Sequence, residues 1–211
     1  MNIARLVAIA GAAAGICGLV LQYFLMLGSM SAQGVGPLAI TWRFFGYFTL
    51  LTNIFVALIW VRGALRPDTR AARLEAAGAV SIVMVGVIYH VLLASRWNPQ
   101  GLQLIADIIL HTVTPILFAL YWVFRPHGAL KWVDAALFVI WPLAYCAYAL
   151  VRGAFDGWYA YFFLDPTHLE PVQLITSVAG LSAVFLVCAL VLVGADKVLT
   201  KRVAPLVAPA T

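Results

Sequence analysis

The chain has 211 residues, of which 64% are hydrophobic and only 10% are charged. Soluble domains carry about 25% charged residues, so this composition excludes a water-soluble globular protein. A helix needs about 20 apolar residues to cross a bilayer, so the length allows at most about six or seven spans with short connections. We therefore expect a single all-α membrane domain over residues 1–211, with no second, soluble domain.

The composition gives no sign of a nucleic-acid, metal or cofactor site. The net charge of +5 comes from 13 Lys and Arg against 8 Asp and Glu, and in so apolar a chain this excess indicates topology rather than a nucleic-acid surface. Cys17, Cys146 and Cys188 stand singly in apolar runs, without CxxC or CxxCH spacing, which disfavours disulfides, a zinc site and attached haem. No cofactor, metal or nucleic-acid partner is predicted.

Six continuous apolar runs follow one another along the chain. Because they are close to twenty residues long, they predict helices rather than the alternating strands of a barrel. The first run is too long for a signal-peptide core and is interpreted as a retained span. The six predicted spans are residues 6–27, 44–61, 76–94, 104–124, 133–151 and 172–194.

The basic residues predict the orientation of these spans. One side of the six-span arrangement carries ten Lys and Arg, whereas the other carries Arg43, Arg96 and Arg152. Basic residues are enriched in cytoplasmic loops. We therefore expect a multi-pass protein of the cell membrane, as in a bacterial inner membrane, with both termini in the cytoplasm.

Polar residues concentrate in the outer halves of the predicted spans, and the inner halves are almost purely apolar. Polar groups in hydrocarbon are costly unless they are paired or face a cavity. The asymmetry indicates a polar pocket that opens outward above an apolar floor, and it argues against a through-channel, which needs polar lining along its whole length. Hydrogen bonding between helices alone is the alternative interpretation.

Two stripes of polar residues sharpen the pocket hypothesis. The first stripe lies in the second span and has i, i+3 and i+4 spacing; it consists of Thr49, Thr52 and Asn53. The second stripe lies in the fourth span and has i, i+4 and i+7 spacing; it consists of Asp107, His111 and Thr114. Each set therefore shares one helix face. Thr52 and His111 lie at similar depths, so they are predicted to meet if these faces turn toward each other.

Such a meeting predicts nucleophilic catalysis. A threonine hydroxyl becomes a nucleophile when an imidazole accepts its proton and a third group fixes the tautomer of that imidazole. Asp107 is one candidate for the third group. Alternatively, Asp107 forms an ion pair with Arg43 or is the partner of His90. Asn53 or a backbone N–H is a candidate oxyanion donor. Pro115 cannot donate to the carbonyl of His111, which predicts a kink at the histidine.

Residues 152–171 hold six aromatic residues in a stretch too short to span the bilayer: Phe155, Trp158, Tyr159, Tyr161, Phe162 and Phe163. Aromatic residues gather at the headgroup level of membranes. An interfacial belt and a lid over an opening between helices are the two interpretations of this segment.

The second span contains the motif Phe48-Thr49-Leu50-Leu51-Thr52-Asn53, and the fourth span contains a histidine four residues before Pro115. Together these motifs resemble the androgen-induced-gene family of six-span membrane proteins and its bacterial relatives. The segment 158–165 is similar to the WYPYPFLD-type segment of the bacterial branch, with Ala160 and Phe162 at the positions of its prolines. The resemblance implies a threonine hydrolase, since animal members cleave fatty acid esters of hydroxy fatty acids. It assigns the nucleophile to Thr52 and the base to His111.

The leading hypothesis is therefore an intramembrane lipid-ester hydrolase whose substrate enters from the bilayer. Thr52 and His111 are its predicted catalytic residues, and Asp107, Asn53, Thr49 and His90 its predicted supporting residues. One alternative is a b-type haem protein, because His90 and His111 lie on adjacent antiparallel spans and two histidines suit haem iron. A transport protein or a scaffolding bundle is the other alternative.

Overall fold

A computed structural model of the chain describes residues 2–203 and contains helices and connecting loops, with no strand in that range. Six segments are long and apolar enough to cross a membrane, namely Ile3–Ser31, Phe48–Leu65, Ala72–Arg96, Leu102–Val123, Asp134–Asp156 and Pro171–Thr200. The predicted all-α, six-span architecture is confirmed, and each predicted run lies mostly within one of these segments.

The elements comprise nine α-helices, two π-helical turns and two 3-10 turns within the described range. In chain order they are α1 Ile3–Ser31, α2 Pro37–Phe44, α3 Phe48–Leu65, α4 Ala72–Ile88, η1 Tyr89–Leu93, η2 Ala94–Arg96, α5 Leu102–Ile108, η3 Ile109–Val113, α6 Thr114–Val123, α7 Asp134–Phe138, α8 Ile140–Asp156, η4 Phe162–Leu164 and α9 Pro171–Val203.

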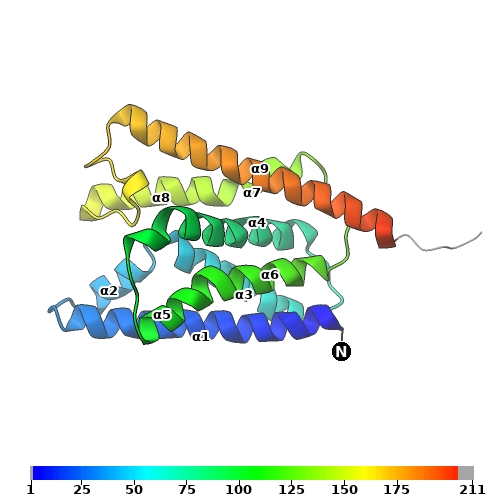
Figure 1. The fold of residues 1–211 in the computed structure, drawn as a ribbon, viewed down its shortest axis with the longest axis horizontal. Helices are drawn as coiled ribbons and strands as arrows, with labels where there is room; N and C mark the ends of the chain where they lie inside the picture. Colours follow the sequence, from blue (N-terminus) through cyan, green and yellow to red (C-terminus); the bar gives the residue numbers. More distant parts are fainter. Residues whose placement is uncertain (1, 204–211) are drawn as a thin grey trace, which may run out of the picture.

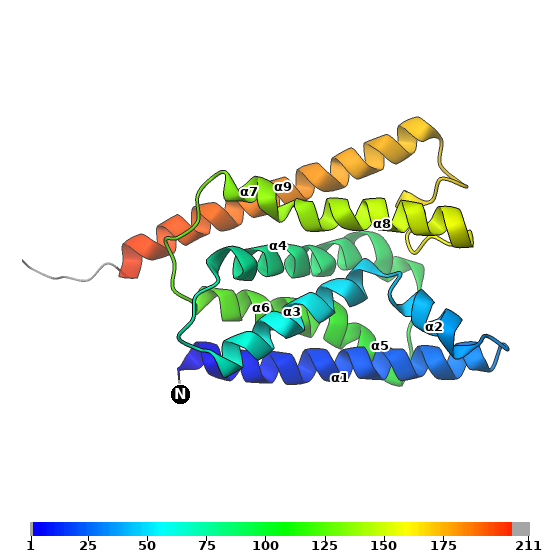
Figure 2. The same ribbon diagram turned by 180° about the vertical axis from the view of Figure 1, so that it is seen from behind.

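The helices run along one common direction, so the bundle has two distinct ends (Figures 1 and 2). At one end, called the terminal end, α1 begins and α9 ends. At the opposite end lie α2, η2 and the loop of residues 157–170; we call it the site end because the cavity described below lies there. The helix α1 packs on α3, α5 and α6, while α4 packs on α3, α6 and α9. Each connection between two successive spans therefore lies at one of these two ends.

Small residues allow α1 to pack closely on its neighbours, and Gly11 and Gly15 form a GxxxG pair on this helix. A Cβ atom at Gly11 would lie within 3 Å of the Trp60 ring on α3, and one at Gly18 would clash with Ile109 on η3. Because neither glycine has a side chain, α1 approaches both helices closely. These contacts place α3, which carries the first polar stripe, and η3, which carries His111 of the second, against the same helix.

The second span begins four residues later than predicted. Residues 37–44 form the separate helix α2, which starts with Pro37 at its first position, and the chain then turns before α3 begins at Phe48. The turn is held by the Tyr145 hydroxyl, which donates to the Gly46 carbonyl at 2.9 Å. Thr49 therefore lies in the first turn of α3 and not one turn inside a longer helix.

Two neighbouring spans widen into π-helical turns near the site end. These are η1 after α4 and η3 between α5 and α6. Pro115 explains the second, since it has no N–H to donate to the His111 carbonyl and leaves the backbone free to depart from α-helical bonding. The predicted irregularity at the histidine takes the form of this turn. Such π turns are frequent at functional sites.

Candidate functional site

A cavity of about 290 Å³ lies at the site end of the bundle. Its walls come from four spans and from the loop of residues 157–170. The lining residues are Gln22, Met26, Tyr47, Thr49, Leu50, Tyr89, Leu93, Trp97, Gln103, Asp107, Leu110, His111, Ala160 and Tyr161. The cavity thus brings one residue of the first polar stripe, Thr49, together with Asp107 and His111 of the second.

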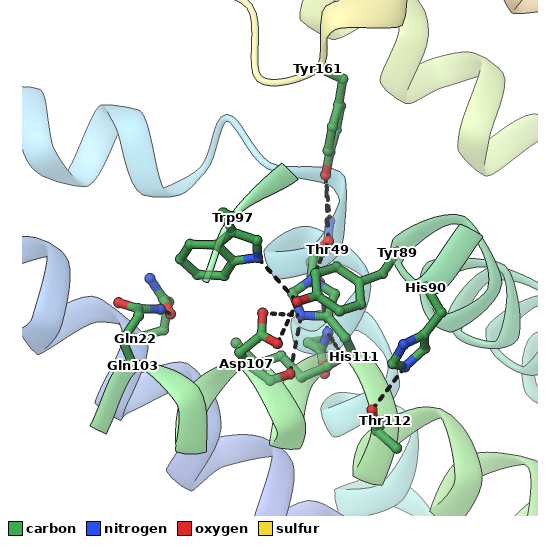
Figure 3. Close-up of polar contacts among 12 residues, drawn as sticks. Gln22, Thr49, Tyr89, His90, Trp97, Gln103, Asp107, His111, Thr112 and Tyr161 are labelled. Carbon is green, nitrogen blue, oxygen red and sulfur yellow. Dashed lines mark hydrogen bonds and ion pairs between the residues drawn. The ribbon is translucent and has the colours of Figure 1, made fainter. Parts of the chain in front are cut away.

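Thr49, His111 and Asp107 form a connected series in this cavity (Figure 3). His111 Nε2 lies 3.3 Å from Thr49 Oγ1. On the other side of the ring, Nδ1 lies 3.1 Å from the Asp107 backbone carbonyl, toward which its N–H points, and 3.1 Å from Asp107 Oδ1. A proton on Nδ1 leaves Nε2 as the acceptor that faces the hydroxyl, which is the tautomer a general base requires.

Tyr89 holds two members of this series at once. Its hydroxyl donates to Asp107 Oδ2 at 2.6 Å and accepts from the Trp97 indole N–H at 3.1 Å. Its ring stacks on the His111 ring, with centroids 3.8 Å apart and planes inclined by 17°. A short hydrogen bond to a carboxylate contributes about 1.5–3 kcal/mol. Tyr89 therefore fixes both the carboxylate and the plane of the imidazole.

Tyr161 reaches into the cavity from the loop of residues 157–170 and contacts Thr49 (Figure 3). The Thr49 backbone N–H donates to the Tyr161 hydroxyl at 3.3 Å, and Thr49 Oγ1 lies 3.5 Å from the same oxygen. Burial raises the pKa of Tyr161 to about 12, so its hydroxyl keeps its proton. Since the backbone donates to the tyrosine oxygen, the tyrosine proton is free to be donated beside Thr49.

Arginine–aromatic stacking anchors that loop to the bundle. The Arg43 guanidinium lies 4.1 Å from the centre of the Trp158 ring, and Arg96 lies 3.7 Å from the centre of Phe162. Such stacking contributes about 0.5–2 kcal/mol per pair. Tyr161 and Leu164 of the loop are buried, whereas Phe155, near the end of α8, is exposed. The aromatic segment therefore covers the cavity in part, as the lid interpretation expected, and leaves some rings outside.

The predicted contact between Thr52 and His111 is not formed. Thr52 is fully buried, and its hydroxyl accepts from the Trp141 indole N–H at 3.0 Å. Asn53 donates to the carbonyls of Thr49 and Leu110 at 2.9 and 3.2 Å. Its amide group thus ties α3 to η3 and has no donor left over for a substrate oxygen. Thr49, one turn toward the site end, takes the position expected for Thr52.

His90 and Arg43 also have partners other than those considered from the sequence. His90 Nε2 lies 3.0 Å from Thr112 Oγ1, and Arg43 stacks on the loop, so neither pairs with Asp107. The Nε2 atoms of His90 and His111 point at different hydroxyls (Figure 3). This arrangement gives the haem alternative no pair of facing imidazoles.

Two functional candidates were missed by reasoning from the sequence. Tyr89 stands directly before His90 on a span with few other polar residues, and that position was the only signal for it. Tyr161 belongs to the aromatic loop and is 112 residues away from Thr49 in sequence, so no spacing rule links the two. Among the described residues no group of three or more His, Cys, Asp or Glu is arranged to hold a metal ion.

Comparisons with protein-family models, with curated proteins and with solved structures find no match for this chain. Its function must therefore be argued from the geometry of the cavity.

Proposed function

We propose that this protein is a membrane-embedded hydrolase of lipid esters in which Thr49 is the nucleophile and His111 the general base. The observation that carries the proposal is the series Thr49–His111–Asp107, in which one imidazole contacts a hydroxyl and a carboxylate on its two sides. The separation of 3.3 Å between hydroxyl and base is slightly longer than a catalytic hydrogen bond, as is common in sites without substrate.

The reaction uses these groups in two steps. Thr49 Oγ attacks the ester carbonyl carbon while its proton passes to His111 Nε2; the bond to the alcohol oxygen then breaks, and His111 returns the proton to that oxygen. Water attacks the acyl-threonine in the same way, which releases the acid and restores the hydroxyl. The Tyr161 hydroxyl, beside Thr49, is the donor for the oxyanion.

The surroundings of Thr49 favour a substrate with apolar chains. Thr49 also borders a second, almost wholly apolar space between α3, α4, α8 and α9, lined in part by Phe48, Val85 and Phe185. An acyl group bonded to Thr49 would have hydrocarbon on that side and the polar cavity on the other. Lipids dissolved in the surrounding bilayer are the esters most available to such a site.

The proposed location is the cell membrane of a bacterium, with both termini in the cytoplasm. Ten Lys and Arg belong to the terminal end and three to the site end, and the cytoplasmic side is the more basic one. Reporter fusions at the C-terminus and in the loop after α3 should read cytoplasmic. A fusion within residues 157–170 should read external, and a cytoplasmic signal there would overturn the orientation.

Two valine variants test the nucleophile against a matched control. Thr49→Val and Thr52→Val each remove one hydroxyl from α3 at nearly constant shape. Fluorophosphonate labelling and hydrolysis of long-chain esters by purified protein should disappear in Thr49→Val and persist in Thr52→Val. Labelling of a folded Thr49→Val with loss in Thr52→Val would return the role to Thr52, as the family resemblance implies. Full activity in both variants would overturn the hydrolase.

A further inference from the structure

An apolar groove of about 450 Å³ runs along the outside of the bundle, between α4–η1 and η3–α6. It is lined by Val83, Gly86, Val87, His90, Val91, His111, Thr112, Pro115, Ile116 and Ala119. Val87, Val91 and Ile116 are exposed on its rim. Both walls belong to membrane-spanning segments, so the groove opens onto the hydrocarbon of the bilayer. From Val83 to His90 it extends about 10 Å along the helix axis.

His111 is shared by this groove and the catalytic cavity. Its side chain is 14% exposed, and among the described residues it is the one that lines both spaces. Gly86 lets the two walls approach closely at this level, because a Cβ atom there would lie 3.1 Å from the His111 carbonyl oxygen and 3.3 Å from the Pro115 ring. The proposed base thus borders both the lipid-facing groove and the catalytic cavity.

One polar pair bridges the groove at its site end. His90 Nε2 on η1 lies 3.0 Å from Thr112 Oγ1 on η3 (Figure 3). His90 is exposed on a surface that faces lipid, where a polar side chain is costly unless it is partnered. Both residues belong to π-helical turns, whose irregular bonding allows the helices to adjust. The rest of the groove offers hydrocarbon contacts.

We propose that this groove holds one acyl chain of a bilayer lipid ester, and that the His90–Thr112 hydrogen bond is a latch that parts to let the ester group pass His111 and reach Thr49. The inference rests on the proposed hydrolase and specifies its substrate as an ester with at least one long unbranched chain, taken sideways from the leaflet at the site end. Water-soluble esters reach Thr49 through the polar cavity and bypass the groove.

A pair of probes of equal reactivity and different length tests the groove. Protein in phosphatidylcholine vesicles is labelled with an ethyl and with a hexadecyl fluorophosphonate. Val87→Trp fills the groove, and the matched control Leu120→Trp places the same ring on an exposed position of α6 outside it. Val87→Trp should slow long-chain labelling at least tenfold and leave ethyl labelling within twofold, while Leu120→Trp changes neither. Equal effects on both probes, or no effect, would overturn the groove as the entry path.

The latch has its own test in Thr112→Val, which removes the hydrogen bond and keeps the side-chain shape. Because a hydrogen bond contributes roughly 1 kcal/mol net, long-chain labelling should become about fivefold faster and ethyl labelling should not change. An unchanged or slower long-chain rate would show that the pair is no barrier to entry.

A measurement that needs no hydrolysis separates failure of the groove from failure of the enzyme. Vesicles containing phosphatidylcholine with a diazirine on its acyl chain should give photoadducts on residues 83–91 of the wild type. Val87→Trp should reduce these adducts several-fold and leave those on α9 unchanged. Absence of fluorophosphonate labelling together with these adducts would refute the proposed function alone; equal adducts in both proteins would refute the groove.

Discussion

The two ends of the bundle bury comparable polar groups and use them in opposite ways. At the terminal end, Glu75 is 2% exposed and both of its oxygens contact the Arg125 guanidinium, at 2.9 and 3.2 Å. Arg125 in turn donates to the carbonyls of Pro67 and Thr69. At the site end, Asp107 is 5% exposed, but its partners lead to an imidazole, a hydroxyl and a cavity.

Asp196 repeats the terminal-end pattern. Its carboxylate accepts from the backbone N–H groups of Gly128 and Leu130, at 2.9 and 3.1 Å, and lies 3.3 Å from His127 Nδ1. The carboxylates there close loops onto helices. The comparison teaches that burial of a charged group does not mark a functional site. The distinguishing feature is a base whose acceptor nitrogen faces a hydroxyl beside open space.

His111→Ala should have the largest effect on activity and little effect on stability. Removing the base should lower hydrolysis by about a thousandfold or more, because nucleophile and base act as a unit. For the same reason, the double variant with Thr49→Val should be little slower than either single variant. Single-turnover kinetics and thermal unfolding in detergent measure the two quantities. Additive losses in the double variant would contradict a shared role.

Glu75→Gln should give the reverse result at the terminal end. Breaking a buried ion pair by changing one partner costs about 3–5 kcal/mol, so the unfolding free energy should fall by roughly that amount. Activity per folded molecule should not change. The control is Arg73→Gln, which breaks an ion pair with Asp134 whose arginine side chain is 61% exposed and should cost below about 1 kcal/mol. A stable Glu75→Gln with lost activity would erase the distinction between the ends.

Tyr161→Phe should reduce turnover by about a hundredfold, which is typical for the loss of one oxyanion donor. The ring and its packing remain, so unfolding should change little. The readout is the separation of kcat from KM, since an oxyanion donor acts mainly in the transition state. A rise in KM with unchanged kcat would instead make Tyr161 a substrate contact.

Among the three substitutions in the cavity, Asp107→Asn should have the smallest effect, a loss of about tenfold in kcat. The imidazole N–H points at the Asp107 backbone carbonyl, which the substitution keeps, so the catalytic tautomer is retained. Tyr89→Phe, which removes a donor to the carboxylate and keeps the stacking on His111, should show a similar loss in kcat with unchanged KM. A loss as large as that of His111→Ala would mean that the carboxylate itself fixes the ring.

The sequence by itself determined the architecture and the chemical groups of the site. Spans follow from runs of apolar residues because hydrocarbon requires every backbone bond to be satisfied within the helix. The i, i+4 spacing of Asp107 and His111 places them one turn apart, and their side chains meet with Nδ1 and Oδ1 3.1 Å apart. The polar pocket was predicted because polar residues are costly in hydrocarbon.

Only the tertiary structure decided which threonine meets the histidine and what surrounds the pair. Thr49 and Thr52 belong to the same stripe, so their spacing does not show which of them meets His111. The break before Phe48 sets the depth and rotation of α3, and the π-helical turn at His111 sets those of the fourth span. Tyr161 and Trp141 then contact Thr49 and Thr52 from segments about a hundred residues away. Contacts between distant segments depend on how helices pack, and helical periodicity carries no information about them.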